Sequence, residues 1–312
     1  DQRGYGRTTG WTPGYDAELS PFRMVNLVRD ALGLVAALGC THVDAVIGHD
    51  FGSPVAAWCA TLRPDVFRSV VLMSAPFGGP PPLPPLGGSH GPRDASAVLD
   101  ALAALPRPRT HYQWYYSTPQ ADADMRDAPQ GLHAFLRAYY HVKSGDWAAN
   151  RPHPLAPGAE GLALLPTYYV MDRGVDMAAT VAPHAPSPPE IAANTWLPDA
   201  ALRVYTDEFA RTGFQGGLQW YRCRTSGRFV AEEQTWAGRT IDVPAMFVAG
   251  ARDWGVFQKH GELDLMRTRA CTRFVGTELV EGAGHWVQQE RPDAVIAHLL
   301  QFLREARHRA GA

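Results

Sequence analysis

The sequence predicts an α/β fold in which helices flank a mostly parallel β-sheet and a helical cap interrupts the core. Two observations carry this prediction. Short continuous apolar runs alternate with helical patterns toward both ends of the chain, as is typical of parallel strands buried on both faces. Between them the pattern turns helical and aromatic, and residues 93–236 hold five of the nine Trp. A chain of 312 residues, 46% of them apolar, can form one or two domains.

An amphipathic helix is predicted at residues 20–40. Ser20 serves as its N-cap, Pro21 takes the first helical position and Gly39 ends it. Six apolar residues recur with helical spacing on one face: Met24, Leu27, Val28, Ala31, Val35 and Leu38.

A strand, a tight turn and a second helix follow. The segment DAVIGHD at 44–50 is a short buried strand that ends on Asp50. The helix at 53–64 carries small residues, which let it pack closely on the sheet, and another apolar strand lies at 69–77. We place this first part of the core at residues 1–78.

A linker rich in Pro and Gly ends the alternation, and we place linker and helical cap together at residues 79–236. The alternation resumes in a second core part at 237–312, with one strand that ends at Asp253 and another that ends at His285. A final helix is predicted at 292–303. Its residues expected to be buried are Val295, Ile296, Leu299, Leu300 and Leu303.

Charge and cysteine usage argue against several classes of protein. The formal net charge is −2 and no basic stripe is present, which argues against a nucleic-acid partner. No apolar run approaches the roughly 18 to 20 residues of a membrane span. Cysteines without metal-ligand spacing favour a cytoplasmic protein with neither metal nor cofactor. The four are interpreted as reduced packing residues: Cys40, Cys59, Cys223 and Cys271.

Three chemically active residues lie at the carboxyl ends of predicted parallel strands, where the loops of an open α/β sheet converge on a site. They are Asp50, Asp253 and His285, and their chain order of nucleophile, acid and histidine is that of the α/β-hydrolase triad. A carboxylate is suited to displacement at an alkyl carbon, where it forms an alkyl ester. We therefore expect Asp50 to attack an epoxide or a carbon–halogen bond.

The ester formed on Asp50 must then be hydrolysed. His285, oriented by Asp253, is predicted to activate a water that attacks the ester carbonyl. The backbone N–H of Phe51, at the start of the helix, is predicted to hold the oxyanion of this second step.

Four segments resemble the epoxide hydrolases of the α/β-hydrolase fold: DQRGYGRT, GHDFG, ARDWG and GAGHW. The resemblance implies two cap tyrosines that hydrogen-bond the epoxide oxygen, and it maps them onto Tyr112 and Tyr221, with Tyr115 and Tyr116 as competitors of Tyr112. We also assign four tryptophans to the substrate pocket: Trp114, Trp220, Trp254 and Trp286. Family members carry an H-G-x-P oxyanion segment upstream of these motifs that is absent here. We therefore expect N-terminal strands of the sheet to be missing from this chain.

Two alternatives stay open. A haloalkane or haloacid dehalogenase shares the triad, but it places a Trp or Arg beside the nucleophile, where this chain has Phe51. A ligand-binding relative without turnover is the second alternative. The partners we expect are a small-molecule epoxide and water, without nucleic acid or a membrane span, and a homodimer is left open.

Overall fold

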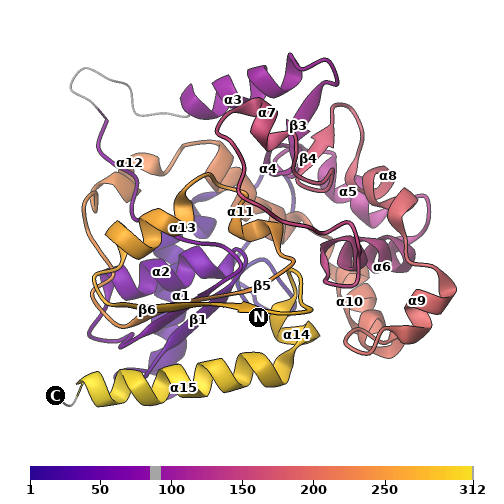
Figure 1. The fold of residues 1–312 in the computed structure, drawn as a ribbon. Helices are drawn as coiled ribbons and strands as arrows, with labels where there is room; N and C mark the ends of the chain where they lie inside the picture. Colours follow the sequence, from indigo (N-terminus) through magenta and orange to yellow (C-terminus); the bar gives the residue numbers. More distant parts are fainter. Residues whose placement is uncertain (85–92, 311–312) are drawn as a thin grey trace. The chain divides into compact units, whose positions relative to one another are not determined.

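The computed structural model of the protein describes residues 1–84 and 93–310, which form two compact units (Figure 1). We call them the helical unit and the sheet unit. The helical unit comprises Asp1–Arg23, His90–Trp147 and Leu155–Phe229. The sheet unit comprises Met24–Ser89, Ala148–Pro154 and Val230–Ala312.

A parallel sheet forms the centre of the sheet unit. Within the described residues it has four strands in the order β1-β2-β5-β6, and every neighbouring pair is parallel. The strands are β1 (Val46–His49), β2 (Val70–Met73), β5 (Ala245–Gly250) and β6 (Phe274–Val280). Every residue of β2 and β5 is buried, which explains why these segments are continuously apolar rather than alternating.

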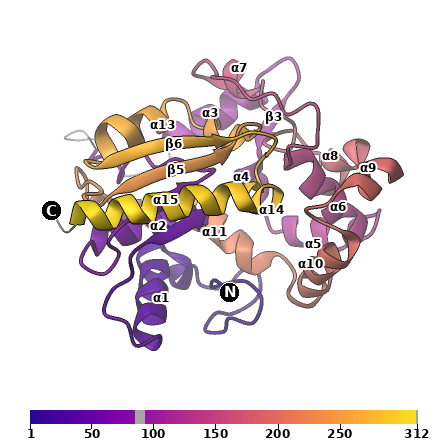
Figure 2. The same cartoon turned by 60° about the horizontal axis from the view of Figure 1, so that its bottom comes forward.

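Helices cover both faces of this sheet. Figure 1 shows α15 along one face and α2 and α13 on the other, and Figure 2 shows how α15 follows the strands. The helical elements of the unit are α1 (Met24–Ala37), α2 (Gly52–Leu62), α12 (Val230–Gln234), η3 (Trp254–Val256), α13 (Glu262–Leu265), η4 (Met266–Ala270), α14 (Val287–Glu290) and α15 (Pro292–Ala310).

The buried face of α15 differs from the prediction. Val295 and Phe302 belong to the core cluster that joins this helix to β2, β5 and β6, whereas Ile296 and Leu300 are 51% and 52% exposed. Residues 295 and 302 are two helical turns apart and face the sheet, whereas Ile296 lies about 100° and Leu300 about 140° around the helix from Val295. The apolar stripe therefore identified the helix and its buried Val295, but the prediction was wrong for Ile296 and Leu300.

The ends of α1 also differ from the prediction in part. Ser20 is not its N-cap, because residues 20–22 form a short 3-10 turn, η1 (Ser20–Phe22), and Arg23 is extended. Leu38 is exposed rather than buried. The end of the helix is confirmed: Gly39 has a φ of +70°, and the next N–H, that of Cys40, donates to a carbonyl five residues back.

The helical unit contains one short antiparallel pair, β3 with β4, that the sequence pattern did not indicate. Its elements after η1 are α3 (Arg93–Ala103), β3 (Arg109–His111), α4 (Tyr112–Tyr115), α5 (Ala121–Arg126), α6 (Leu132–Lys143), α7 (Ala159–Leu162), β4 (Val170–Asp172), α8 (Met177–Val181), η2 (Ala182–His184), α9 (Pro188–Ala193), α10 (Asp199–Thr212) and α11 (Gln215–Thr225).

The first 23 residues pack in the helical unit, although the sequence placed residues 1–78 together in the core. The indole N–H of Trp220 donates to the Arg3 carbonyl over 2.9 Å. The backbone at Gly4 lies so close to Gly216 that a Cβ atom at either position would overlap the other residue's carbonyl oxygen. This close approach to α11 explains why glycine stands at positions 4 and 216.

Candidate active site

Asp50 lies in a strained turn between β1 and α2. Its φ is +51°, a conformation that non-glycine residues rarely adopt, and its N–H donates to the Met73 carbonyl over 3.1 Å. A Cβ atom at Gly48 would overlap the carbonyl oxygen of Gly52, so glycine is required there. The Asp50 side chain stays 35% exposed while the neighbouring backbone is packed away. This turn presents a carboxylate at the carboxyl end of the sheet.

His285 stands between two carboxylates. Its Nε2 lies 3.1 Å from Asp50 Oδ1, and its Nδ1 lies 3.2 Å from Asp253 Oδ1. Asp253 comes three residues after the end of β5, and His285 comes five residues after the end of β6, in loops rather than on the strands themselves as predicted. The two loops approach closely, since a Cβ atom at Gly250 would overlap the Gly284 carbonyl.

Asp253 is held in its charged form. Burial raises the pKa of this carboxyl, but the charge and hydrogen bond of His285, a hydrogen bond with Ser74 and the N–H of Gly255 together lower it below its ordinary value. The Gly255 N–H donates over 2.7 Å. A buried carboxylate at this place accepts the Nδ1 proton and thereby directs Nε2 of His285 toward Asp50.

Two residues that the sequence analysis did not single out support His285. His49 Nε2 lies 2.6 Å from the His285 carbonyl oxygen, and because a carbonyl can only accept, this nitrogen carries a proton. Burial, followed by the charge of His285, lowers the pKa of His49 to about 4. The hydroxyl oxygen of Ser74, a residue with a φ of +66° after β2, lies 3.3 Å from the same carbonyl oxygen. The position of His49 directly before Asp50 was the only local indication.

Tyr112 and Tyr221 lie together within the helical unit, with ring centroids 5.8 Å apart. The competing phenols are engaged elsewhere: Tyr115 donates to an Asp124 carboxylate oxygen over 3.1 Å, and Tyr116 donates to the Tyr139 hydroxyl over 3.1 Å. The Tyr112 hydroxyl instead accepts from the neighbouring Gln113 amide over 3.3 Å. Tyr112 and Tyr221 therefore form a pair of phenols within one unit.

The predicted pocket residues have different surroundings. Trp286 packs beside His285, with ring centroids 4.8 Å apart, and Trp114 packs edge-on to His111. Trp220 and Trp254 are buried, at 2% and 4% exposed, and their assignment to the substrate pocket stays a prediction. Phe51 occupies the N-cap position of α2 in a helical conformation.

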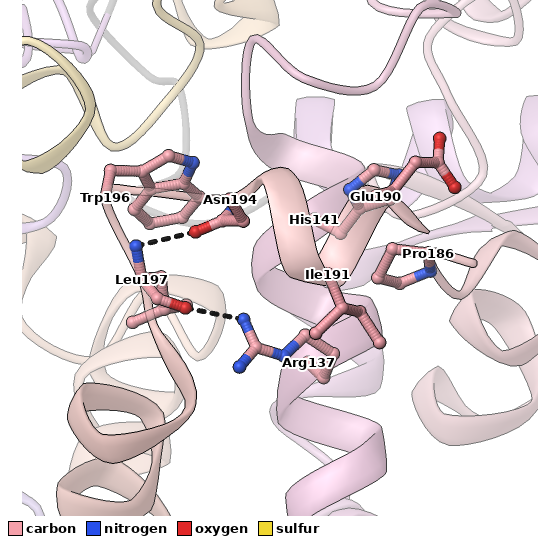
Figure 3. Close-up of a pocket in the computed structure, with 8 residues that line it drawn as sticks. All are labelled: Arg137, His141, Pro186, Glu190, Ile191, Asn194, Trp196 and Leu197. Atoms are coloured by element: carbon pink, nitrogen blue, oxygen red, sulfur yellow. Dashed lines mark hydrogen bonds between the residues drawn. The ribbon is translucent and has the colours of Figure 1, made fainter. Parts of the chain in front are cut away.

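A separate pocket lies within the helical unit (Figure 3). Figure 3 shows the Arg137 guanidinium directed at the Leu197 carbonyl, to which it donates over 2.7 Å. His141 lines the same pocket, and burial lowers its pKa. None of the residues predicted for chemistry lines this pocket, which therefore takes no part in the assignment of the site.

Two features are absent from residues 1–84 and 93–310. No cluster of three or more His, Cys, Asp or Glu side chains has a geometry that could hold a metal ion. In the same residues, no helix is long and apolar enough to cross a membrane.

Comparisons with known proteins agree with the predicted fold. The family model for the alpha/beta hydrolase fold matches residues 1–100. An epoxide hydrolase from an endophytic Streptomyces is 32% identical, with a TM-score of 0.76, over 99% of this chain and 80% of that one. Epoxide hydrolase A from Mycobacterium thermoresistibile is 29% identical, with a TM-score of 0.68, over 97% of this chain and 81% of that one.

A curated relative gives the same result. Epoxide hydrolase B of Mycobacterium tuberculosis is 29% identical over 307 residues, which are 97% of this chain and 82% of the relative. These comparisons confirm the predicted fold class and the resemblance drawn from the four sequence motifs. The chain belongs to the epoxide hydrolase family of the α/β-hydrolase fold.

Proposed function

We propose that the protein hydrolyses an apolar epoxide to a vicinal diol through a covalent ester on Asp50. One observation carries the proposal: His285 lies 3.1 Å from Asp50 and 3.2 Å from Asp253, while Asp50 occupies a strained turn that keeps it accessible. Membership of the epoxide hydrolase family supports the same chemistry.

In the first step, an Asp50 carboxylate oxygen attacks one carbon of the epoxide ring. The bond from that carbon to the epoxide oxygen breaks, an alkyl ester forms, and the released alkoxide takes a proton from an acid. In the second step, His285 Nε2 removes a proton from water, and the hydroxide attacks the ester carbonyl of Asp50. The Phe51 N–H is proposed to stabilise the oxyanion, and the diol leaves after receiving the proton from His285. Hydrolysis leaves Asp50 as a carboxylic acid, whose proton returns to the acid used in the first step and so restores both groups.

Tyr112 and Tyr221 are the acids we propose for the first step. An epoxide opens to an alkoxide, which is a poor leaving group unless it is protonated, and a phenol of pKa about 10 can supply the proton. Support comes from two observations: the Tyr112 and Tyr221 rings lie 5.8 Å apart, and the Tyr116 ring, although only 5.1 Å from Tyr221, donates its hydroxyl proton to Tyr139. The Phe51 side chain offers no N–H for a departing halide, which favours epoxide opening over dehalogenation.

Two further parts of the proposal concern the surroundings of the enzyme. We keep the cytoplasm as its location, because the four cysteines, all within the described part of the chain, form no disulfide. A homodimer and the absence of a nucleic-acid partner stay predictions from the sequence.

The test is to trap the ester. With His285→Gln, a reactive aryl epoxide such as styrene oxide should add its own mass to the protein, and peptide mapping should place the adduct on Asp50. The double variant that also carries Asp50→Ala should gain no mass. An unmodified His285→Gln protein, or an adduct that persists without Asp50, would rule out the covalent mechanism.

A further inference from the structure

We propose that Glu290 is a positioning residue that holds the backbone on both sides of His285 and thereby sets the place of its imidazole. This inference rests on the proposed function, because it assigns the residue to the second of the two steps. Glu290 ends the short helix α14, and only 4% of its surface is exposed.

The carboxylate of Glu290 accepts hydrogen bonds from the peptide N–H groups on both sides of His285. The Gly284 N–H lies 3.0 Å from both Glu290 oxygens, and the Trp286 N–H lies 3.0 Å from Oε1. Backbone hydrogen bonds to a buried carboxylate are charge-assisted and stronger than those between neutral groups. One side chain therefore fixes the peptide before His285 and the peptide after it.

The loop needs such an anchor because it lies beyond the sheet. β6 and its pairing with β5 end at Val280, so the residues up to α14 lie outside the strand ladder. Buried N–H groups without a partner are costly, so a carboxylate within the loop satisfies them. The carbonyl of His285 itself is held from the opposite side, where the His49 ring donates over 2.6 Å.

The two steps on Asp50 place different demands on this anchor. Attack of Asp50 on the epoxide requires no proton transfer through His285, whereas hydrolysis requires Nε2 to face the attacking water. Small displacements of a catalytic group can slow a reaction by as much as about a hundredfold. Loosening the loop should therefore slow hydrolysis of the ester and leave its formation unchanged.

Two conservative variants separate the effect of the length of the side chain at position 290 from the effect of its charge. Glu290→Gln keeps the length of the side chain and one carbonyl oxygen at the position of Oε1, which accepts both N–H groups. Glu290→Asp keeps the charge but is one methylene too short to reach them. A matched control is Glu262, which accepts the Gly78 N–H over 3.0 Å in the same unit without contacting the histidine loop. Glu262→Asp shortens that carboxylate in the same way.

Each variant is mixed rapidly with styrene oxide, quenched in acid and analysed by intact mass. Glu290→Asp should slow ester breakdown about tenfold or more, so that the Asp50 adduct accumulates, with an unchanged rate of ester formation. Glu290→Gln should slow breakdown by about threefold or less, and Glu262→Asp should leave both rates unchanged.

Several results would overturn the assignment. Equal loss of both rates in Glu290→Asp would mean that Glu290 supports the fold rather than the histidine. Slower breakdown in Glu290→Gln than in Glu290→Asp would mean that charge, and not reach, matters. If Glu290→Asp fails to fold, the Glu290→Gln result decides: breakdown slowed by more than about threefold contradicts the proposal. A parent protein that forms no ester at all would instead refute the proposed function.

Discussion

Lowering the pH from 7 to 5 should destabilise the protein through His49. Burial lowers the pKa of this ring from 6.5 to about 4, so the folded state resists a proton that the unfolded chain accepts. The charges that act on the ring are those of His285, Asp50 and Asp253. Below pH 6.5 the unfolded state therefore binds more protons, and the free energy of unfolding falls until the pH passes about 4.

The size of the effect follows from these two pKa values. Proton linkage between 6.5 and about 4 gives a loss of about 2 kcal/mol in the free energy of unfolding from pH 7 to pH 5. Since His49 as a residue keeps part of its surface exposed, we expect about 1 to 2 kcal/mol. A loss of this size is a substantial part of the stability of a typical domain.

Urea unfolding at pH 7 and pH 5 measures the effect, with His49→Gln as the reference. The glutamine amide can donate to the His285 carbonyl but does not titrate, so it removes the linkage while it keeps a donor. The parent protein should lose about 1 to 2 kcal/mol more than the variant over this pH range. Equal losses in the two proteins would show that His49 titrates normally in the folded state, contrary to the reasoning.

Three other perturbations have distinct outcomes. Gly48→Ala should lower the free energy of unfolding by about 1 to 3 kcal/mol and abolish turnover, because the new methyl group overlaps the backbone in the turn at the nucleophile. The control Gly33→Ala, in open space on α1, should raise the free energy of unfolding by about 0.5 to 1 kcal/mol. Equal effects of the two substitutions would contradict the steric argument. Tyr221→Phe should slow alkylation of Asp50 by an epoxide about tenfold or more, and the double variant with Tyr112→Phe should nearly stop it. Any reaction with a haloalkane should stay unchanged. A double variant that opens epoxides at the normal rate would exclude both phenols as proton donors. Asp253→Asn should favour the wrong imidazole tautomer and make the ester accumulate in mass spectra, whereas unchanged turnover would remove Asp253 from the site.

Local sequence determined the parts of the site that depend on local sterics. The turn at Asp50 needs glycine at position 48 because the backbone of Gly52 returns within van der Waals distance, and that requirement is visible as GHDFG. Likewise, fully buried parallel strands must be apolar on both faces, so β2 and β5 were evident as continuous runs. The end of α1 at Gly39 follows from the left-handed conformation that glycine adopts without strain.

Only the tertiary structure decided which distant groups meet. His49 reaches the His285 carbonyl across 236 positions of the chain, and Ser74 reaches it across 211, because β1, β2, β5 and β6 lie in that order in the sheet. The buried face of α15 and the packing of the first residues against α11 depend in the same way on what lies opposite. An apolar pattern indicates that one face of an element is buried, and a glycine can indicate that another segment approaches the backbone closely. Neither pattern identifies the segment that packs opposite. That segment is determined by the order of the strands and by the paths of the loops, whose residues show no periodic pattern.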